Sequence, residues 1–299
     1  MLQNHAGELA ALAVAFFWTI TALAFESASM KVGSLVVNIL RILLGFLFLS
    51  FFTLIKRDLF FPTDAGVENW IWLMLSGFVG FFLGDLFLFK SYTIIGSRFA
   101  MLIMTTVPPI TAILGRVFLN ERLSSIGLLG MTLTFIGIAL AIFSRDGDRP
   151  GLKLKLAPKG ILFAFGGAMG QAGGLVLSKH GMGDYDPFAA TQIRLVAGFI
   201  SFTLLISLLR RWKSVFVAIT DRKGMTGITI GSFFGPFLGV SFSLLSIKYI
   251  ETGIASTIMA MVPILIIAPS VILFKQKVTF IEIIGALISI TGIALLFIK

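Results

Sequence analysis

Asp85 is the side chain of this sequence with the clearest potential for chemistry. It lies roughly fifteen residues into an apolar segment of about 69–92, where an ionised carboxylate has a high desolvation cost. A carboxylate in such a place can bind a cation or carry a proton in a water-filled cavity. The structural alternative is that Asp85 caps a local helix break after Gly84, or pairs with Arg41 or Lys90.

Arg41 and Arg194 are basic side chains at equivalent positions in two other apolar segments, and each is followed four residues later by Gly-Phe. Both lie close enough to the end of a segment for a long side chain to reach a polar interface. A repeated position favours an architectural role. The alternative is a gate in which an arginine exchanges partners such as Asp85 or Glu26.

Further side chains at mid-depth of the apolar segments predict a small-molecule cavity. Ligand sites combine mainly apolar walls with a few placed polar groups. In the alternative interpretation, Ser and Thr hold helices together while Phe and Met fill gaps, which describes most of the 31 Phe. The candidate cavity residues are Trp18, Thr21, Phe81, Asp85, Met104, Gln171, Phe237, Ser241 and Met259.

Glycines and prolines predict how the segments pack and bend. Pro108 and Pro263 lack a backbone N–H and are expected to bend their helices, so they are candidate hinges. The segments at about 124–143 and 279–298 each have a face of small residues. Such faces allow close helix packing, within the protein or between two copies of it. These faces are formed by Gly130, Gly137, Gly285 and Gly292.

The elements that must hold these residues are membrane helices. Of the 299 residues, 57% are hydrophobic and 13% are charged, whereas soluble proteins have about 25% charged residues. The mean hydropathy is +1.01. The apolar segments last about 20 residues without alternation, which suits helices that cross roughly 30 Å of hydrocarbon and excludes a barrel. The net charge of +10 is expected to lie in loops, so no nucleic-acid partner is predicted.

Ten apolar segments predict an all-α membrane protein with ten transmembrane helices, in two halves. The longest polar stretch, 144–159, follows the fifth segment. We therefore expect one five-helix repeat over 1–145, a linker over 146–157 and a second repeat over 158–299. The segments are about 8–25, 33–55, 69–92, 97–118, 124–143, 158–179, 187–209, 225–247, 252–274 and 279–298.

The two halves are related by an internal match. An offset of 155 positions superposes Met104 on Met259 and Pro108 on Pro263, and the match continues to Leu140 on Leu295. Because each half has an odd number of segments, the second must enter the membrane upside down. Such inverted repeats are typical of transporters, with the substrate site between the repeats.

Short motifs make the pattern more specific. They are Phe17-Trp18 in the first segment, Arg41 in the second, Val107-Pro108-Pro109 in the fourth and Leu119-Asn120-Glu121 before the fifth. With two five-helix halves, they resemble the EamA family of the drug/metabolite transporter superfamily over essentially the whole chain. The resemblance implies that the first and sixth helices line the cavity and that both termini are cytoplasmic.

Two positions depart from the family pattern. Thr19 follows Trp18 where the family usually has glycine, and Gln276 occupies the position in the second half that Glu121 has in the first. Membrane orientation is also open. Most Lys and Arg fall on the side away from the termini, so the positive-inside rule places the termini outside, against the family resemblance.

The expected function is secondary transport, with export favoured, of a small polar metabolite such as an amino acid. The chain has no G-x-x-x-x-G-K-[ST] loop, so a proton gradient or exchange would drive it rather than ATP. We expect no cofactor or metal, and as partners only a small-molecule substrate and the lipid bilayer. A monomer or weak homodimer in a bacterial inner membrane is the predicted state.

Other classes remain as alternatives. Gly84-Asp85 is superficially similar to the motif of intramembrane aspartyl proteases, but these need two carboxylates that share a proton, and no second deep acid is present. A serine hydrolase would need a histidine, and both His5 and His180 lie at segment ends. A receptor or scaffold does not account for an inverted repeat, and a channel would show a filter sequence.

Overall fold

The computed structural model describes residues 5–146, 157–265 and 280–297, and within these ranges all regular elements are helical. The linker predicted at 146–157 falls almost wholly outside the described residues, as does Gln276. The elements of the first half are α1 (Ala6–Val32), α2 (Ser34–Arg57), α3 (Val67–Gly77), η2 (Phe78–Gly84), α4 (Asp85–Met104), α5 (Val107–Phe118) and α6 (Ser125–Asp146).

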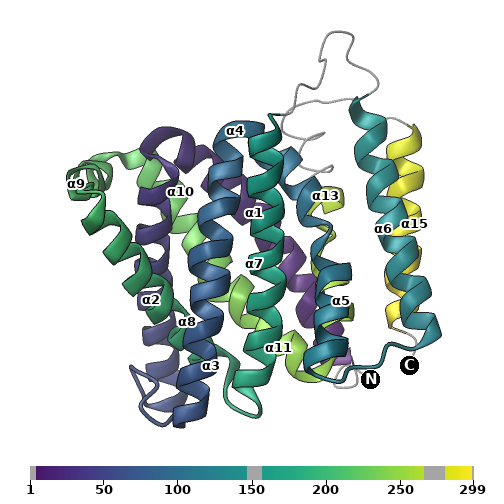
Figure 1. Ribbon diagram of the computed structural model, residues 1–299, viewed down its shortest axis with the longest axis horizontal. Coiled ribbons are helices and arrows are strands. Elements are labelled where there is room, and N and C mark those ends of the chain that lie inside the picture. Colours follow the sequence, from purple (N-terminus) through teal and green to yellow (C-terminus); the bar gives the residue numbers. More distant parts are fainter. Residues whose placement is uncertain (1–4, 147–156, 266–279, 298–299) are drawn as a thin grey trace.

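The second half contains elements in a similar order. They are α7 (Pro158–Met182), α8 (Pro187–Leu208), α9 (Trp212–Thr220), α10 (Arg222–Ser232), η3 (Phe233–Gly239), α11 (Val240–Tyr249), α12 (Thr252–Met259), α13 (Val262–Leu265) and α15 (Phe280–Leu296). Most of these helices stand side by side in one bundle, with α6 and α15 as a pair at its edge (Figure 1).

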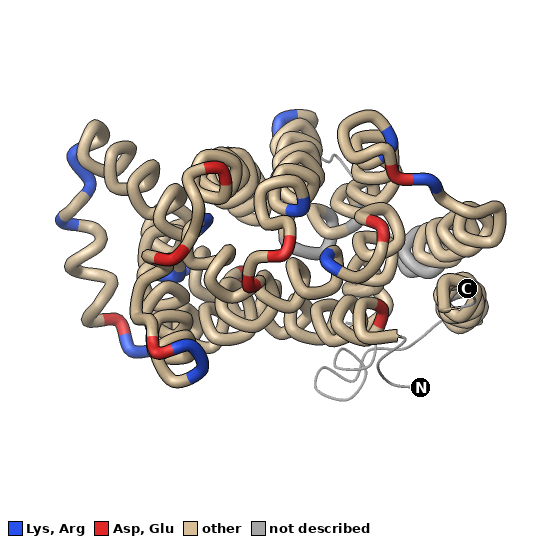
Figure 2. Tube along the Cα trace, turned by 90° about the horizontal axis from the view of Figure 1, so that it is seen from below, with Lys and Arg blue, Asp and Glu red and all other residues tan. Residues whose placement is uncertain are grey.

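Length and composition of the helices fit a bilayer. Six helical stretches, the longest being Val67–Gly96, are long and apolar enough to cross a membrane, and four shorter helices are also apolar. Many large apolar side chains on their outer faces are exposed, such as Ile55 and Leu208. Charged positions are sparse among the helices when the molecule is viewed from the side of the termini (Figure 2). In hydrocarbon, helices satisfy every backbone polar group within the segment.

Both ends of the described chain lie on one side of the bundle (Figure 1). The ring of His5, just before α1, lies 5.7 Å from the ring of Phe297, just after α15. Helix α1 therefore leaves this side and α15 returns to it.

Two π-helical segments interrupt long helices at matching places. The segment η2 continues α3 into α4, and η3 continues α10 into α11. Both contain seven residues and both end on a glycine, Gly84 or Gly239. They are separated by the same 155 positions as the sequence repeat. A π turn adds a residue to the helical circuit, so it rotates the face on which the following side chains lie.

The two helices predicted to bend at prolines are instead interrupted. Helix α4 ends at Met104 and α5 begins at Val107, while α12 ends at Met259 and α13 begins at Val262. Pro108 and Pro263 are thus the second residues of new helices, where a missing N–H costs no helical hydrogen bond. The chain breaks just before each proline rather than bending at it.

Helices α6 and α15 pack through their glycines. A Cβ atom at Gly137 would lie 2.5 Å from the carbonyl oxygen of Gly285, and one at Gly292 would lie 2.7 Å from that of Gly130. Ser289 adds a hydrogen bond of 3.2 Å to the carbonyl oxygen of Thr134. The four glycines meet within the protein, where the absence of side chains lets two backbones approach closely.

This contact predicts different tolerance at two glycines of α6. In Gly137→Ala the new Cβ meets backbone atoms of α15, so we expect the free energy of unfolding to fall by about 1–3 kcal/mol. In Gly127→Ala the nearest atom is Ser124 Oγ at 3.3 Å, and stability should be unchanged or slightly higher. Thermal denaturation of both variants in detergent provides the comparison, and equal midpoints would contradict the packing.

Candidate functional site

A cavity of about 120 Å³ lies inside the bundle, bordered by both halves of the chain. Its walls come from α1, α2, α7 and α8, from the segments around η2 and η3, and from the two helix interruptions. A site for one water needs about 10–15 Å³ of such space, so the cavity can hold a small organic molecule.

Most of the residues expected at a cavity meet here. Trp18 of α1 and Gln171 of α7 both line it, which brings together the first helix of each half. The other expected cavity residues that line it are Thr21, Phe81, Asp85, Met104 and Met259. The candidate gating residues Arg41 and Arg194 and the candidate hinge Pro263 line it as well. Pro108 borders a separate apolar space between α5, α6 and α12.

Two of the expected cavity residues lie elsewhere. Phe237 belongs to a buried aromatic cluster, with its ring 5.2 Å from that of Phe233. Ser241 is fully buried, and Ser243 of the same helix lines the cavity instead. The expectation rested on depth along the segment, and depth does not decide which side of a helix faces the cavity.

Arg41 and Asp85 form an ion pair on the cavity wall. The side chain of Arg41 is 4% exposed and that of Asp85 is 15% exposed. Arg41 also donates from Nε to Asn38 Oδ1 at 2.9 Å. A buried charge is tolerated only when it is paired and hydrogen-bonded, and both conditions hold for Arg41.

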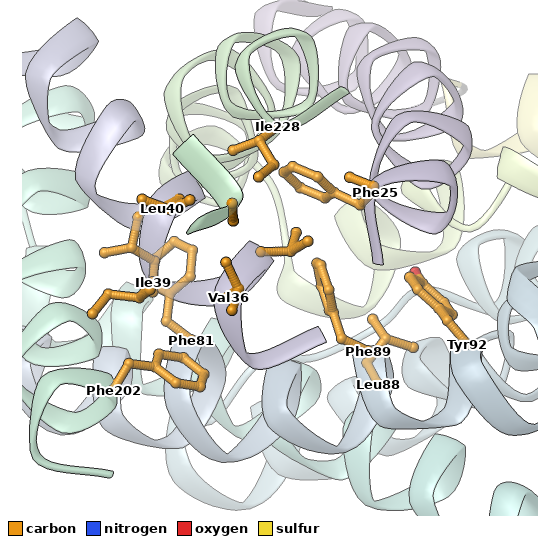
Figure 3. Close-up of a cluster of buried hydrophobic side chains, with 14 of the residues drawn as sticks. Phe25, Val36, Ile39, Leu40, Phe81, Leu88, Phe89, Tyr92, Phe202 and Ile228 are labelled. Carbon is orange, nitrogen blue, oxygen red and sulfur yellow. The ribbon is translucent and has the colours of Figure 1, made fainter. Parts of the chain in front are cut away.

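Aromatic rings surround this ion pair. The guanidinium carbon of Arg41 lies 4.8 Å from the ring centre of Phe89, 5.7 Å from that of Phe25 and 5.6 Å from that of Phe81. Phe25, Phe81 and Phe89 belong to one buried cluster of side chains contributed by several helices (Figure 3). The rings add cation–π attraction to Arg41, which is worth more where the cation is desolvated.

Arg194 shares the cavity with this pair but has different surroundings. Its side chain is almost completely buried, and its guanidinium carbon lies 5.0 Å from the ring centre of Phe81, which Arg41 also contacts. Its Nε atom has no hydrogen-bond partner. The absence of a side chain at Gly80 leaves space for Nη2 of Arg194, because a Cβ at Gly80 would lie 3.1 Å from that atom.

Glycines bring the backbone of α7 close to the segment that carries Asp85. A Cβ at Gly170 would lie 2.5 Å from Gly84 Cα, and one at Gly174 would lie 2.9 Å from Gly80 Cα. Gln171 is therefore held directly against the π turn that precedes Asp85. The glycines of α7 were visible in the sequence, but their partners in η2 were not.

A second polar network lies near the end of the bundle that carries the termini. Lys179 Nζ donates to a carboxylate oxygen of Glu121 at 2.7 Å and to the carbonyl oxygen of Ile250 at 2.7 Å. Thr252 donates to the same carboxylate from its backbone N at 3.0 Å and from Oγ1 at 2.6 Å. Ile250 contacts the position of Gly7 near the start of α1. Sequence reasoning had noted Glu121 as part of a motif but not its partners.

An exposed ion pair on the same side provides a contrast. Arg57 at the end of α2 pairs with Asp64, whose side chain is 40% exposed. Tyr185 donates its hydroxyl proton to Asp64 at 2.8 Å, and burial raises the pKa of this phenol to about 12, so it remains a donor at neutral pH.

The two ion pairs predict unequal losses of stability. Asp85→Ala leaves the buried guanidinium group of Arg41 without its carboxylate, and we expect about 3–5 kcal/mol of unfolding free energy to be lost. Asp64→Ala removes an exposed partner and should cost about 1 kcal/mol or less. Chemical denaturation in detergent measures both changes, and losses of the same size would contradict the role of burial.

A double variant separates charge from packing. When both members of a buried ion pair are replaced by apolar residues, neither charge of the pair is left without its partner. The double variant Arg41→Leu with Asp85→Leu should therefore lose less unfolding free energy than Asp85→Ala does.

The chain is similar to known proteins in sequence and in fold. The model of the EamA-like transporter family matches residues 5–143 and again residues 158–298. A protein of Bacillus subtilis (strain 168) described as "Uncharacterized transporter YyaM" is 26% identical over 226 residues, which cover 76% of this chain and 72% of that protein. A solved structure titled "Crystal structure of protein" aligns with a TM-score of 0.72 at 16% identity, covering 97% of this chain and 94% of the other, which shows a shared fold.

Proposed function

Because the chain belongs to the EamA-like transporter family of the drug/metabolite transporter superfamily, and so is a multi-pass integral membrane protein, we propose that it is a secondary transporter. It exports a small polar metabolite, such as an amino acid, by alternating access and has no enzymatic activity. The observation that carries the proposal is a buried cavity, bordered by both halves of the chain, that contains Arg41, Asp85 and Arg194.

The proposed architecture is ten transmembrane helices in two inverted five-helix repeats. The repeats are residues 1–145 and 158–299, joined by a linker at 146–157. The two separate family matches support this division. The six long and four shorter apolar helices support the number of spans. Matching π turns and matching interruptions at Met104 and Met259 support the repeat.

Alternating access needs elements that can separate at one end while the other end stays closed. The interruptions at Met104–Val107 and Met259–Val262 border the cavity and allow each half-helix to move separately. The network of Glu121, Lys179 and Thr252 joins the loop after α5, the end of α7 and the start of α12. We assign it to the closed end of the cavity in this conformation, where it must separate for that end to open.

The ion pair at the cavity suits a coupling role. When Arg41 and Asp85 separate during the cycle, the carboxylate can take up a proton, and re-formation of the pair releases it. A hydrolase mechanism with two carboxylates is not favoured, because among the described residues that line the cavity only Asp85 is acidic. A receptor or scaffold does not explain a charged cavity at the contact between the halves.

The proposed surroundings follow from the same features. The exposed apolar faces require a lipid bilayer, and the bacterial relative supports an inner membrane. The protein acts as a monomer or weak homodimer on a small-molecule substrate. It uses no cofactor and does not bind nucleic acid.

The proposal predicts loss of coupling in Asp85→Asn. Purified protein in liposomes should accumulate at least one compound from a metabolite panel when a pH gradient is imposed. Asp85→Asn should lower this accumulation by about tenfold or more while counterflow exchange continues, because the amide cannot carry the proton. Gel filtration and thermal denaturation provide the folding control. Unchanged dependence on the pH gradient would assign Asp85 a structural role only.

The cavity predicts a steric effect. Ser243→Trp fills space between the halves and should reduce uptake by about tenfold or more, because the substrate must fit the remaining volume. Leu287→Trp on the exposed face of α15 adds a similar side chain towards lipid and should leave uptake unchanged. If both folded variants transport equally well, the cavity is not the transport path.

A further inference from the structure

Arg194 is a buried cation whose Nε atom has no hydrogen-bond partner among the described residues. Its residue is 6% exposed, its side chain lines the cavity, and its Nε has no hydrogen-bond partner. Within the described part of the chain no ion pair involves its guanidinium group. The contrast with Arg41 is direct, because Arg41 has both a carboxylate and an amide oxygen as partners. A guanidinium group has five N–H donors in a fixed fork, so Arg194 can bind a further acceptor.

The backbone of α8 fixes the direction in which Arg194 extends. A Cβ at Gly77 would lie 2.2 Å from the carbonyl oxygen of Arg194 and 2.8 Å from its Cα, so α3 packs directly on this turn of α8. Gly80, one turn later, leaves space for Nη2. The side chain is thus placed in the cavity with its planar group over Phe81 at 5.0 Å. The Nε atom of this group carries an N–H that has no hydrogen-bond partner.

The charges of the cavity favour an anion. The side chains that line it include two guanidinium groups and one carboxylate, together with the neutral phenol of Tyr92. Their sum is a single positive charge in a mostly apolar environment. A carboxylate group would offset this charge locally, whereas a ligand that carries only positive charge would leave two uncompensated charges in low dielectric.

We propose that Arg194 binds the carboxylate of the transported substrate, and that the substrate is a small monocarboxylate with an apolar body. This inference rests on the proposed function and assigns its substrate class. The fork of donors matches a carboxylate with two parallel hydrogen bonds. The apolar body would contact Phe81, Met104 and Met259, which line the same space. A phosphate monoester is a poorer match, because it carries nearly two negative charges at neutral pH.

Binding in detergent tests this assignment without requiring transport. The probes are L-leucine, L-phenylalanine, 4-methylpentanoate and 3-phenylpropionate, each compared with its primary amide by thermal denaturation of the purified full chain. At least one carboxylate should raise the midpoint in a concentration-dependent way, and its amide should not. An amide that stabilises as well as its acid, or no stabilisation by any of the four acids, would overturn the proposal.

Variants locate the effect at Arg194. Arg194→Gln should weaken binding of the stabilising carboxylate by about tenfold or more, and Arg194→Lys less, since it keeps the charge but loses the fork. Arg116→Gln, at an exposed position of α5, is the matched control and should bind as the unmodified protein does. If Arg194→Gln fails to fold, Gly80→Ala replaces it, because the new Cβ displaces Nη2 and should weaken binding while the charge remains. Unchanged affinity in the folded Arg194 variants would overturn the assignment.

The two proposals can fail separately. A carboxylate that binds through Arg194 but is never moved across liposomes would contradict the transport function and leave the binding site standing. Transport of amines or amides that is insensitive to Arg194→Gln would contradict the carboxylate site and leave the transport function standing.

Discussion

The ion pair between Arg41 and Asp85 is the interaction on which the interior of this protein depends. Two charges in an apolar bundle would be costly unless each had a partner, and here Asn38 and three aromatic rings complete the surroundings of Arg41. The pair joins α2 to the start of α4, so it links two helices of the first half at the cavity wall. Phe25, Phe81 and Phe89 surround it, with ring centres 4.8 to 5.7 Å from the guanidinium carbon of Arg41.

Close backbone contacts allow the second half to reach this pair. Gly170 and Gly174 of α7 press against Gly84 and Gly80 of η2, with no side chain between them. That approach places Gln171 at the same cavity as Asp85. The π-helical segment η2 permits this close approach, because it ends at Gly84, directly before Asp85. The glycines and the π turn thus act together to set the distance between the two halves.

The halves are similar in backbone but not in side chains. The segment η3 lies at the same offset as η2, yet it faces side chains of α1 rather than glycines: a Cβ at Gly239 would lie 2.7 Å from Trp18 Nε1, and one at Gly235 would lie 2.9 Å from Thr21. Val240 occupies the place of Asp85, and Arg194 consequently has no carboxylate of its own. Because Asp85 is the only acid among the described residues that line the cavity, the cavity has an excess positive charge, and this asymmetry is the basis of the proposed substrate class.

The sequence by itself determined that the chain is made of membrane helices, that its halves match, and that Asp85, Arg41 and Arg194 lie among apolar residues. These features depend on composition and on short periodic patterns, which a single chain displays directly. It also identified Trp18 and Gln171 as cavity residues through family resemblance. Only the tertiary structure decided that Arg41 forms an ion pair with Asp85 while Arg194 does not. It also decided that the prolines follow helix breaks and that Ser243, rather than Ser241, lines the cavity. The reason is physical: partners far apart in the chain are chosen by packing, and depth along a segment does not decide which side of a helix faces the cavity.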